Sequence, residues 1–223
     1  NSVAIGKKAK ATDSNAVGVG YEAEAIKANT VAMGRKVYAN TAGSVALGSN
    51  ATASNTGAIA IGGYTGNSAN TTASGDNSVA LGVSATADGD NSVAIGRDVT
   101  ASAESAIAIG KDAVSNKKNA VALGSGSDTS SAATVQSSTT IGGKIYSWNK
   151  GVLPTTDSDG RQVSVGKSGF ERQIKNVAAG EISANSTDAI NGAQLYSVAS
   201  GLAKDLKVPY VSINSTATGA GSN

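Results

Sequence analysis

The stretch NSVAIG at residues 91–96 decides the fold, because variants of this phrase recur along most of the 223-residue chain. The phrase closes ten times on a glycine, and most of the steps between these glycines are 14 residues long. The ten are Gly6, Gly20, Gly34, Gly48, Gly62, Gly82, Gly96, Gly110, Gly124 and Gly142. A unit this short cannot fold alone, so neighbouring units must stack into one quasi-linear body.

Large apolar residues stand three and one positions before nine of the ten closing glycines, with a small residue between them, as in Val93-Ala94-Ile95. Alternation at period two predicts a short strand whose large side chains share one face. We expect that face to be the interior of every coil. The residues that this expectation assigns to the core of the coil are Val3, Ile5, Val17, Val19, Val31, Met33, Val45, Leu47, Ile59, Ile61, Val79, Leu81, Val93, Ile95, Ile107, Ile109, Val121 and Leu123.

A second alternation follows six of the glycines, because small apolar residues stand three and five positions after them, as Ala51 and Ala53 do after Gly48. It predicts a second strand that also turns small groups inward. Two strands and two turns use all 14 residues, which leaves no room for a helix. The sequence therefore predicts an all-β parallel solenoid of about ten coils over residues 1–142. Residues 63–76 and 125–136 interrupt the period and are expected to form loops.

The composition argues against catalysis and metal binding. The chain has no Cys, no His and a formal net charge of +2. The usual neutral-pH base is missing, and the charge is too small to indicate a nucleic-acid partner. Asp88-Gly89-Asp90 and Asp157-Ser158-Asp159 suggest calcium loops, but turn chemistry explains them better. An enzyme built on a solenoid would need a cleft with His, clustered acids or metal ligands. We expect no catalytic, cofactor-binding or metal-binding residues.

Two features indicate self-association. Each predicted coil has a thin core, and the row of alanines between the large residues would offer a smooth surface for another subunit. Near the C-terminus a helix is expected to begin at Ser186 or Thr187, run through Leu206 and stop at Pro209. Leu195, Val198 and Leu202 follow one another at the spacing of a short coiled-coil seam.

The phrase Asn-Ser-Val-Ala-Ile-Gly at period 14 resembles the head repeats of YadA-like trimeric autotransporter adhesins. Residues 164–180, followed by Ser186-Thr187-Asp188-Ala189-Ile190-Asn191-Gly192-Ala193-Gln194-Leu195, resemble the neck of that family. Residues 210–217 are similar to the opening of another head module. Asn1 already lies inside the repeated phrase, so we expect the chain to be a segment of a longer array.

The resemblance implies a left-handed parallel β-roll, trimerised side by side, over residues 1–142. It also implies an irregular connector over 143–160, a neck with a short trimeric coiled coil over 161–208, and a further head module from 209 to 223. The residues expected at the neck and trimer contacts are Arg172, Gln173, Asp188, Ile190, Asn191, Leu195, Val198 and Leu202. Arg172 is expected to make hydrogen bonds between subunits, and Asn191 could hold an anion on the trimer axis.

The family further implies an exported protein of the Gram-negative cell surface, held in the outer membrane by a C-terminal β-barrel outside this segment. Its heads bind matrix proteins such as collagen, fibronectin or laminin, bind other cells, or bind one another. The resemblance therefore predicts a non-enzymatic adhesin head that acts by multivalent binding. The alternative is a passive spacer that projects a binding domain located elsewhere in the fibre.

Overall fold

The structure is a computed structural model that describes residues 1–63, 70–148, 150–153 and 160–205. It divides into two compact units. The first comprises residues 1–147 and 152–172, and the second comprises residues 148–151 together with residues from 173 onward. Each unit is described by itself below.

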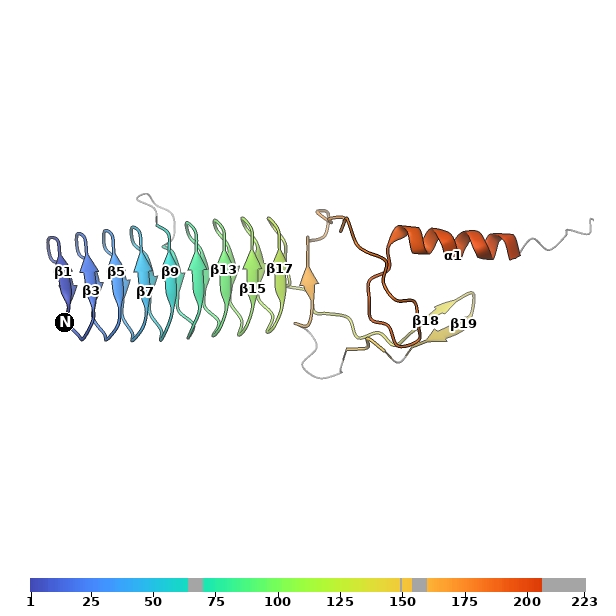
Figure 1. Cartoon of the computed structure of the whole chain (residues 1–223), viewed down its shortest axis with the longest axis horizontal. Coiled ribbons are helices and arrows are strands. Elements are labelled where there is room, and N and C mark those ends of the chain that lie inside the picture. The colour runs from blue at the N-terminus through green and yellow to red at the C-terminus, as the bar shows by residue number, and fades with distance from the viewer. Residues whose placement is uncertain (64–69, 149, 154–159, 206–223) are drawn as a thin grey trace, which may run out of the picture. The chain divides into compact units, whose positions relative to one another are not determined.

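Two parallel sheets form most of the first unit (Figure 1). Sheet A holds ten strands in order, namely β1 (Val3–Ile5), β3 (Val17–Val19), β5 (Val31–Met33), β7 (Val45–Leu47), β9 (Ile59–Ile61), β11 (Val79–Leu81), β13 (Val93–Ile95), β15 (Ile107–Ile109), β17 (Val121–Leu123) and β20 (Val163–Ser164). Sheet B holds β2 (Lys10–Ala11), β4 (Glu24–Ala25), β6 (Tyr38–Ala39), β8 (Thr52–Ala53), β10 (Thr72–Ala73), β12 (Thr86–Ala87), β14 (Thr100–Ala101) and β16 (Val114–Ser115).

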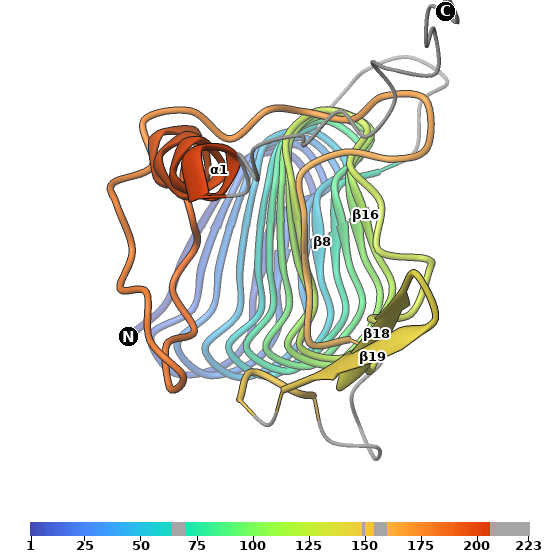
Figure 2. The same ribbon diagram turned by 90° about the vertical axis from the view of Figure 1, so that its right-hand side faces the viewer.

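Equivalent residues of successive coils pair directly, as Val79 does with Val93 in sheet A and Thr86 with Thr100 in sheet B. The six-residue insertion before β10 leaves this register intact, because Thr72 still pairs with Thr52. Seen along its axis, the coil is flat, with the two sheets facing each other (Figure 2). The predicted parallel β-solenoid is confirmed, with about eight turns.

The interior of the coil is lined by the small residues. From β5 to β17, the alanines at the middle of the sheet A strands are fully buried, as are nearly all the alanines of sheet B. Val37 and Val99 are the largest fully buried side chains among the described residues. The prediction that the small residues after the closing glycines face the interior is therefore confirmed. The prediction that the large apolar residues before the closing glycines form the interior is wrong, because these residues point out of the coil.

Six of the residues predicted to be core are exposed, and the others are half-buried on the outer face of sheet A. The exposed ones are Val3, Ile5, Met33, Leu81, Ile109 and Leu123. The half-buried ones are Val17, Val19, Val31, Val45, Leu47, Ile59, Ile61, Val79, Val93, Ile95, Ile107 and Val121. The physical reason is thickness: a 14-residue coil brings its two sheets so close together that rows of Val and Ile from one sheet would overlap the other.

The turns depend on backbone that is unusual for side-chain-bearing residues. The residue two positions after seven of the closing glycines carries a side chain and has a positive φ, for example 53° at Lys36 and 55° at Asp98. A left-handed conformation costs a residue with a Cβ about 1–2 kcal/mol. The 14-residue period therefore includes a small strain in nearly every coil.

Lys36→Gly is accordingly expected to stabilise the solenoid by about 0.5–1 kcal/mol, since the relief of strain exceeds the entropy that glycine adds to the unfolded chain. Arg35→Gly is the control, because Arg35 lies in the same turn without a positive φ and should lose stability on the same scale. Thermal unfolding of the two variants beside the parent measures both shifts. Equal shifts would contradict the strain.

The tenth repeat does not form a coil. Its residues lie in β18 (Ser138–Ile141), which pairs antiparallel with β19 (Lys144–Ser147) around Gly142 and Gly143. These glycines have φ values of 56° and 80°, as a two-residue hairpin turn requires. The closing glycine of the tenth phrase is thus a hairpin glycine, and β20 takes the next place in sheet A beside β17.

The second unit contains one described helix, α1 (Gly192–Asp205). It begins later than the predicted start at Ser186 or Thr187. Its cap is Asn191, whose Oδ1 accepts a hydrogen bond from the Gln194 backbone N–H at 3.1 Å. The Gln194 Oε1 accepts one from the Asn191 N–H at 3.2 Å, which completes a reciprocal capping box. Leu206, Pro209 and the predicted further head module lie outside the described residues.

Candidate functional site: the outer faces of the solenoid and the neck

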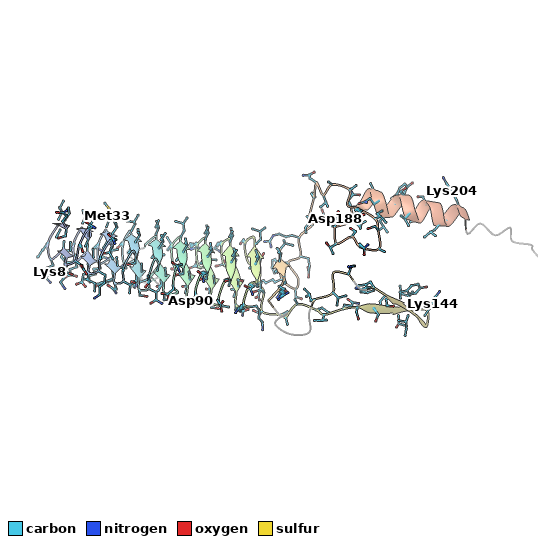
Figure 3. All side chains as sticks on the ribbon, turned by 60° about the horizontal axis from the view of Figure 1, so that its bottom comes forward. Lys8, Met33, Asp90, Lys144, Asp188 and Lys204 are labelled. Carbon is cyan, nitrogen blue, oxygen red and sulfur yellow. The ribbon has the colours of Figure 1, made fainter. Side chains whose placement is uncertain are left out.

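The outer face of sheet A is an apolar strip. Each of its rungs from β1 to β17 contributes two large side chains that point outward, as Met33 does in Figure 3. Met33 and Ile5 are 45% and 59% exposed. An apolar groove of about 450 Å³ lies on this sheet where Leu47, Ile61 and Leu81 follow one another. A continuous apolar surface of this kind is rare on monomers and marks an interaction face.

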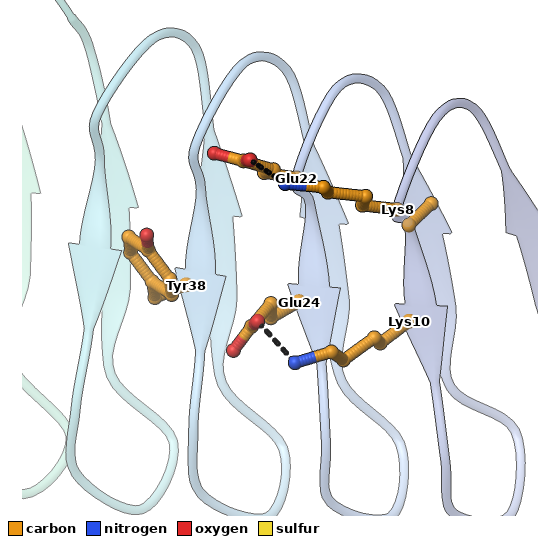
Figure 4. Close-up of a pocket in the computed structure, with 6 residues that line it drawn as sticks. Lys8, Lys10, Glu22, Glu24 and Tyr38 are labelled. Atoms are coloured by element: carbon orange, nitrogen blue, oxygen red, sulfur yellow. Dashed lines mark hydrogen bonds and ion pairs between the residues drawn. The ribbon is translucent and has the colours of Figure 1, made fainter.

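The outer face of sheet B is polar and changes character along the solenoid. Its central outward column reads Lys10, Glu24, Tyr38, Thr52, Thr72, Thr86, Thr100 and Val114. At the charged end, Lys8 pairs with Glu22 at 3.0 Å and Lys10 pairs with Glu24 at 2.6 Å. These side chains line an open groove of about 510 Å³ together with Ala9 and Tyr38 (Figure 4).

The two ion pairs join neighbouring coils. The hydrogen bond to Glu22 raises the pKa of Lys8, and the same contact lowers the pKa of Glu22. The pair therefore favours the folded state above the ordinary pKa of a glutamate and loses that contribution as acid protonates Glu22. Because both groups face solvent, the contacts order the side chains more than they stabilise the fold.

Aspartates at the turns from sheet B to sheet A accept hydrogen bonds from the turn of the neighbouring coil. The Asp90 carboxylate accepts a hydrogen bond from the Asp76 backbone N–H at 2.9 Å, and the Asp88 carboxylate accepts one from the Ser74 hydroxyl. Within the described residues, no group of three or more potential metal-ligating side chains comes together. Asp157 and Asp159 lie outside the described residues.

Arg172 closes the end of the solenoid within its own chain. Its guanidinium donates to the Val165 carbonyl at 2.6 Å, to the Ser127 hydroxyl at 3.1 Å and to the Ser125 carbonyl. These partners belong to the last coil and to the segment that continues it. These three hydrogen bonds lie within the chain, and the predicted role of Arg172 between subunits stays a prediction.

Asn191 and Gln194 tie the start of α1 to the segment before it. The Asn191 side-chain amide donates to the Val177 carbonyl at 3.1 Å. Gln194 donates to the Gly180 carbonyl at 2.6 Å and accepts from the Gly180 N–H at 3.0 Å. The Asn191 amide nitrogen has a second N–H beside the one donated to Val177, and the expected anion contact on the trimer axis stays a prediction. Asp188 accepts a hydrogen bond from the Glu181 N–H at 3.0 Å.

The predicted seam residues Leu195, Val198 and Leu202 are at least half exposed on α1, and Ile190 and Gln173 are exposed in the segment before the helix. Sequence reasoning missed the capping box, although the spacing Asn-x-x-Gln is its signature. The part of the chain that the structure describes holds no helix long and apolar enough to cross a membrane.

Two families match this sequence. The YadA head domain repeat matches residues 1–23, 42–65, 73–98 and 101–127, and the coiled stalk of trimeric autotransporter adhesin matches residues 173–209. Together they cover more than half of the chain. The autotransporter adhesin BtaE of Brucella suis biovar 1 (strain 1330) is 46% identical over 74 residues, which are 33% of this chain and 9% of that protein. The chain thus corresponds to less than a tenth of that relative.

Two solved structures are also similar. The collagen-binding domain of the Yersinia adhesin YadA is 24% identical, with 89% of this chain and 97% of that chain covered and a TM-score of 0.55. At that identity the likeness concerns the fold. The C-terminal YadA-like domain of BPSL2063 from Burkholderia pseudomallei is 39% identical over 53% of this chain and 47% of that chain, with a TM-score of 0.37. Head repeats and stalk occur here in one chain, and the chain belongs to the YadA-like trimeric autotransporter adhesins.

Proposed function

We propose that this segment is an adhesin head, exported to the bacterial surface, that attaches cells to host matrix or to one another by multivalent binding. The observation that carries the proposal is the contrast between the two sheets. Sheet A presents an apolar strip, whereas sheet B presents a polar face with ordered charges and a tyrosine. One face suits burial between subunits, and the other suits a partner met in water.

The family fold implies a trimer, and the apolar strip of sheet A is the surface that we assign to the subunit contact. This assignment replaces the alanine row, which lies inside the coil. Three solenoids that cover this strip would direct their sheet B faces outward. The same outward pattern would then recur along each chain and three times around the axis, so weak contacts would combine into high avidity.

Collagen, fibronectin, laminin and a second bacterial fibre are the partners that we propose. The Yersinia relative is described as a collagen-binding domain. A ridged face with a repeat at every coil suits long repetitive partners. The groove beside Tyr38 is the place on sheet B where an aromatic ring lies among charged groups, a composition typical of binding hot spots.

Beads that carry the assembled protein test the proposal by attachment to matrix-coated surfaces and by clumping. The triple variant Lys10→Ala, Glu24→Ala, Tyr38→Ala should reduce attachment severalfold. The control, Asp13→Ala, Lys27→Ala, Lys118→Ala, changes exposed residues at the turns between the sheets and should not. If the parent neither attaches nor clumps, the segment is a spacer for a binding domain elsewhere in the fibre.

A further inference from the structure

The turns form the two long edges of the flat coil (Figure 2). We call the edge made by the turns from sheet A to sheet B the AB edge, and the edge made by the return turns the BA edge. In the first coil, built on β1 and β2, Lys7 and Lys8 lie on the AB edge and Asp13 lies on the BA edge. In the second coil, built on β3 and β4, the signs are reversed, since Glu22 lies on the AB edge and Lys27 on the BA edge.

Three of these charges have no ionic partner in their own chain. Lys7, Asp13 and Lys27 are exposed, and none of them forms an ion pair with a residue that the structure describes. Lys7 and Asp13 stand on opposite edges with β2 between them, so they do not meet within the coil. Both edges of the first two coils therefore present charge to a neighbouring molecule.

A parallel trimer closed around sheet A would bring opposite edges together. Three flat coils that turn sheet A toward one axis form a triangle in cross-section. Each corner of that triangle joins the AB edge of one subunit to the BA edge of the next. Cyclic symmetry about an axis along the solenoids keeps equivalent coils at the same height. Lys7 of one copy would then face Asp13 of its neighbour, and Glu22 would face Lys27.

The reversal of sign between the two coils distinguishes one register from its neighbours. The apolar strip does not, because its rungs repeat nearly the same Val-Ala-Ile phrase. A shift by one coil, roughly 4.8 Å, would place Lys7 against Lys27 in one direction and Glu22 against Asp13 in the other. Both shifts bring like charges together, and like-charge contacts disfavour wrong arrangements.

We propose that the charged turns of the first two coils meet across the corners of the trimer and hold neighbouring subunits in register. The inference rests on the trimer and the sheet A contact proposed above. A second copy of this chain is the occupant because the opposite edges of each coil are complementary to one another. Arg97 on the AB edge and Glu104 on the BA edge repeat the arrangement of Lys7 and Asp13 in the coil of β13 and β14.

The test reverses the two charges of the first coil in the full chain, singly and together. Lys7→Asp and Asp13→Lys each bring like charges together at all three corners, so each should weaken trimer association by about fivefold or more in sedimentation equilibrium at low salt. The double variant should return association to within about twofold of the parent. Because the two positions lie on opposite edges of one coil, this restoration can only come through a neighbouring copy.

Two controls separate charge from damage to the turns. Arg35→Asp reverses a charge at the turn position equivalent to Lys7, but residues 40–44 on the BA edge of that coil carry no charge. Asp13→Asn removes the charge and keeps an oxygen for the hydrogen bond that Asp13 Oδ1 accepts from the Ser14 N–H at 2.7 Å. Each control should change association by less than about twofold, because an exposed ion pair contributes little attraction and only its reversal is costly.

The outcomes separate this inference from the trimer on which it rests. A parent that sediments as a single chain at micromolar concentration would overturn both. A parent trimer that is unaffected by the single reversals, is not restored in the double variant, or responds equally to Arg35→Asp would overturn the edge contact alone. In about 1 M salt the screening length falls to roughly 3 Å, so the single variants should there associate like the parent. A loss that persists in this salt would also contradict the edge contact.

Discussion

Ala94→Asp is expected to unfold the central coils of the solenoid, although it changes one of the smallest residues of the repeat. Ala94 is fully buried between the two sheets, where an aspartate would be an unpaired charge. Such a group costs several kcal/mol, on the order of 4 or more. The β-sheet signal in circular dichroism should fall and the melting temperature should drop. Thr100→Asp is the control, because Thr100 lies on the outer face of sheet B and should change stability by less than about 1 kcal/mol.

Val93→Asp should act on assembly rather than on the coil. Val93 is half-buried on the outer strip of sheet A, so the aspartate of a single chain can reach water. In a trimer built on that strip, it would bring like charges together at a cost of several kcal/mol, which is at least a hundredfold in association. We expect the variant to keep its β-sheet signal and to sediment near the 21.7 kDa of one chain. Unfolding by Val93→Asp with Ala94→Asp tolerated would reverse the assignment of the faces.

These two neighbours illustrate what the sequence could and could not predict. Period-two alternation says that Val93 and Ala94 face opposite ways, but it does not say which face is inside. The usual rule places the larger apolar residue in the core, and here it is wrong. The informative signal was the second strand, where the inward residues are mostly alanine. Rows of small residues from the two sheets fit between them in a thin coil. Rows of Val and Ile from sheet A facing the alanines of sheet B would need a larger distance between the sheets.

The strongly periodic part of the chain was predictable because each coil needs the same two short strands and the same turns. Residues 1–124 show the 14-residue period in the strands and in the positive φ values, and the resemblance of the head and stalk segments agrees with the family matches. Gly142 was misassigned because the phrase Thr139-Thr140-Ile141-Gly142 resembles the repeat, although it follows Gly124 by 18 residues instead of 14. Gly143 beside it was the contrary signal, since paired glycines between alternating residues favour a hairpin. The helix start was missed because Ser186 and Asn191 are both good caps, and tertiary bonds to Val177 and Gly180 decide between them.

Gly96→Ala is expected to destabilise the solenoid strongly, although it adds only one methyl group. Gly96 has a φ of 138°, a conformation that side-chain-bearing residues rarely adopt. A Cβ there would lie 2.8 Å from the carbonyl carbon and oxygen of Gly110 in the next coil. Those atoms belong to the backbone, so relief requires the stacking of the two coils to shift. Backbone strain and overpacking together should cost on the order of 3 kcal/mol or more.

Gly43→Ala is the matched control, since it adds the same methyl group at another turn of the solenoid. Gly43 has a φ of 72°, and an added Cβ would have its nearest neighbours at 3.9 Å. Only the left-handed conformation is then penalised, at about 1 kcal/mol. Because the closing glycines stack on one another, the damage from Gly96→Ala should also spread along the row. Hydrogen exchange should show faster amide exchange in the coils on both sides of Gly96, and for Gly43→Ala only at its own turn. If the two variants melted together, the close approach of the closing glycines would not be what maintains the 14-residue period.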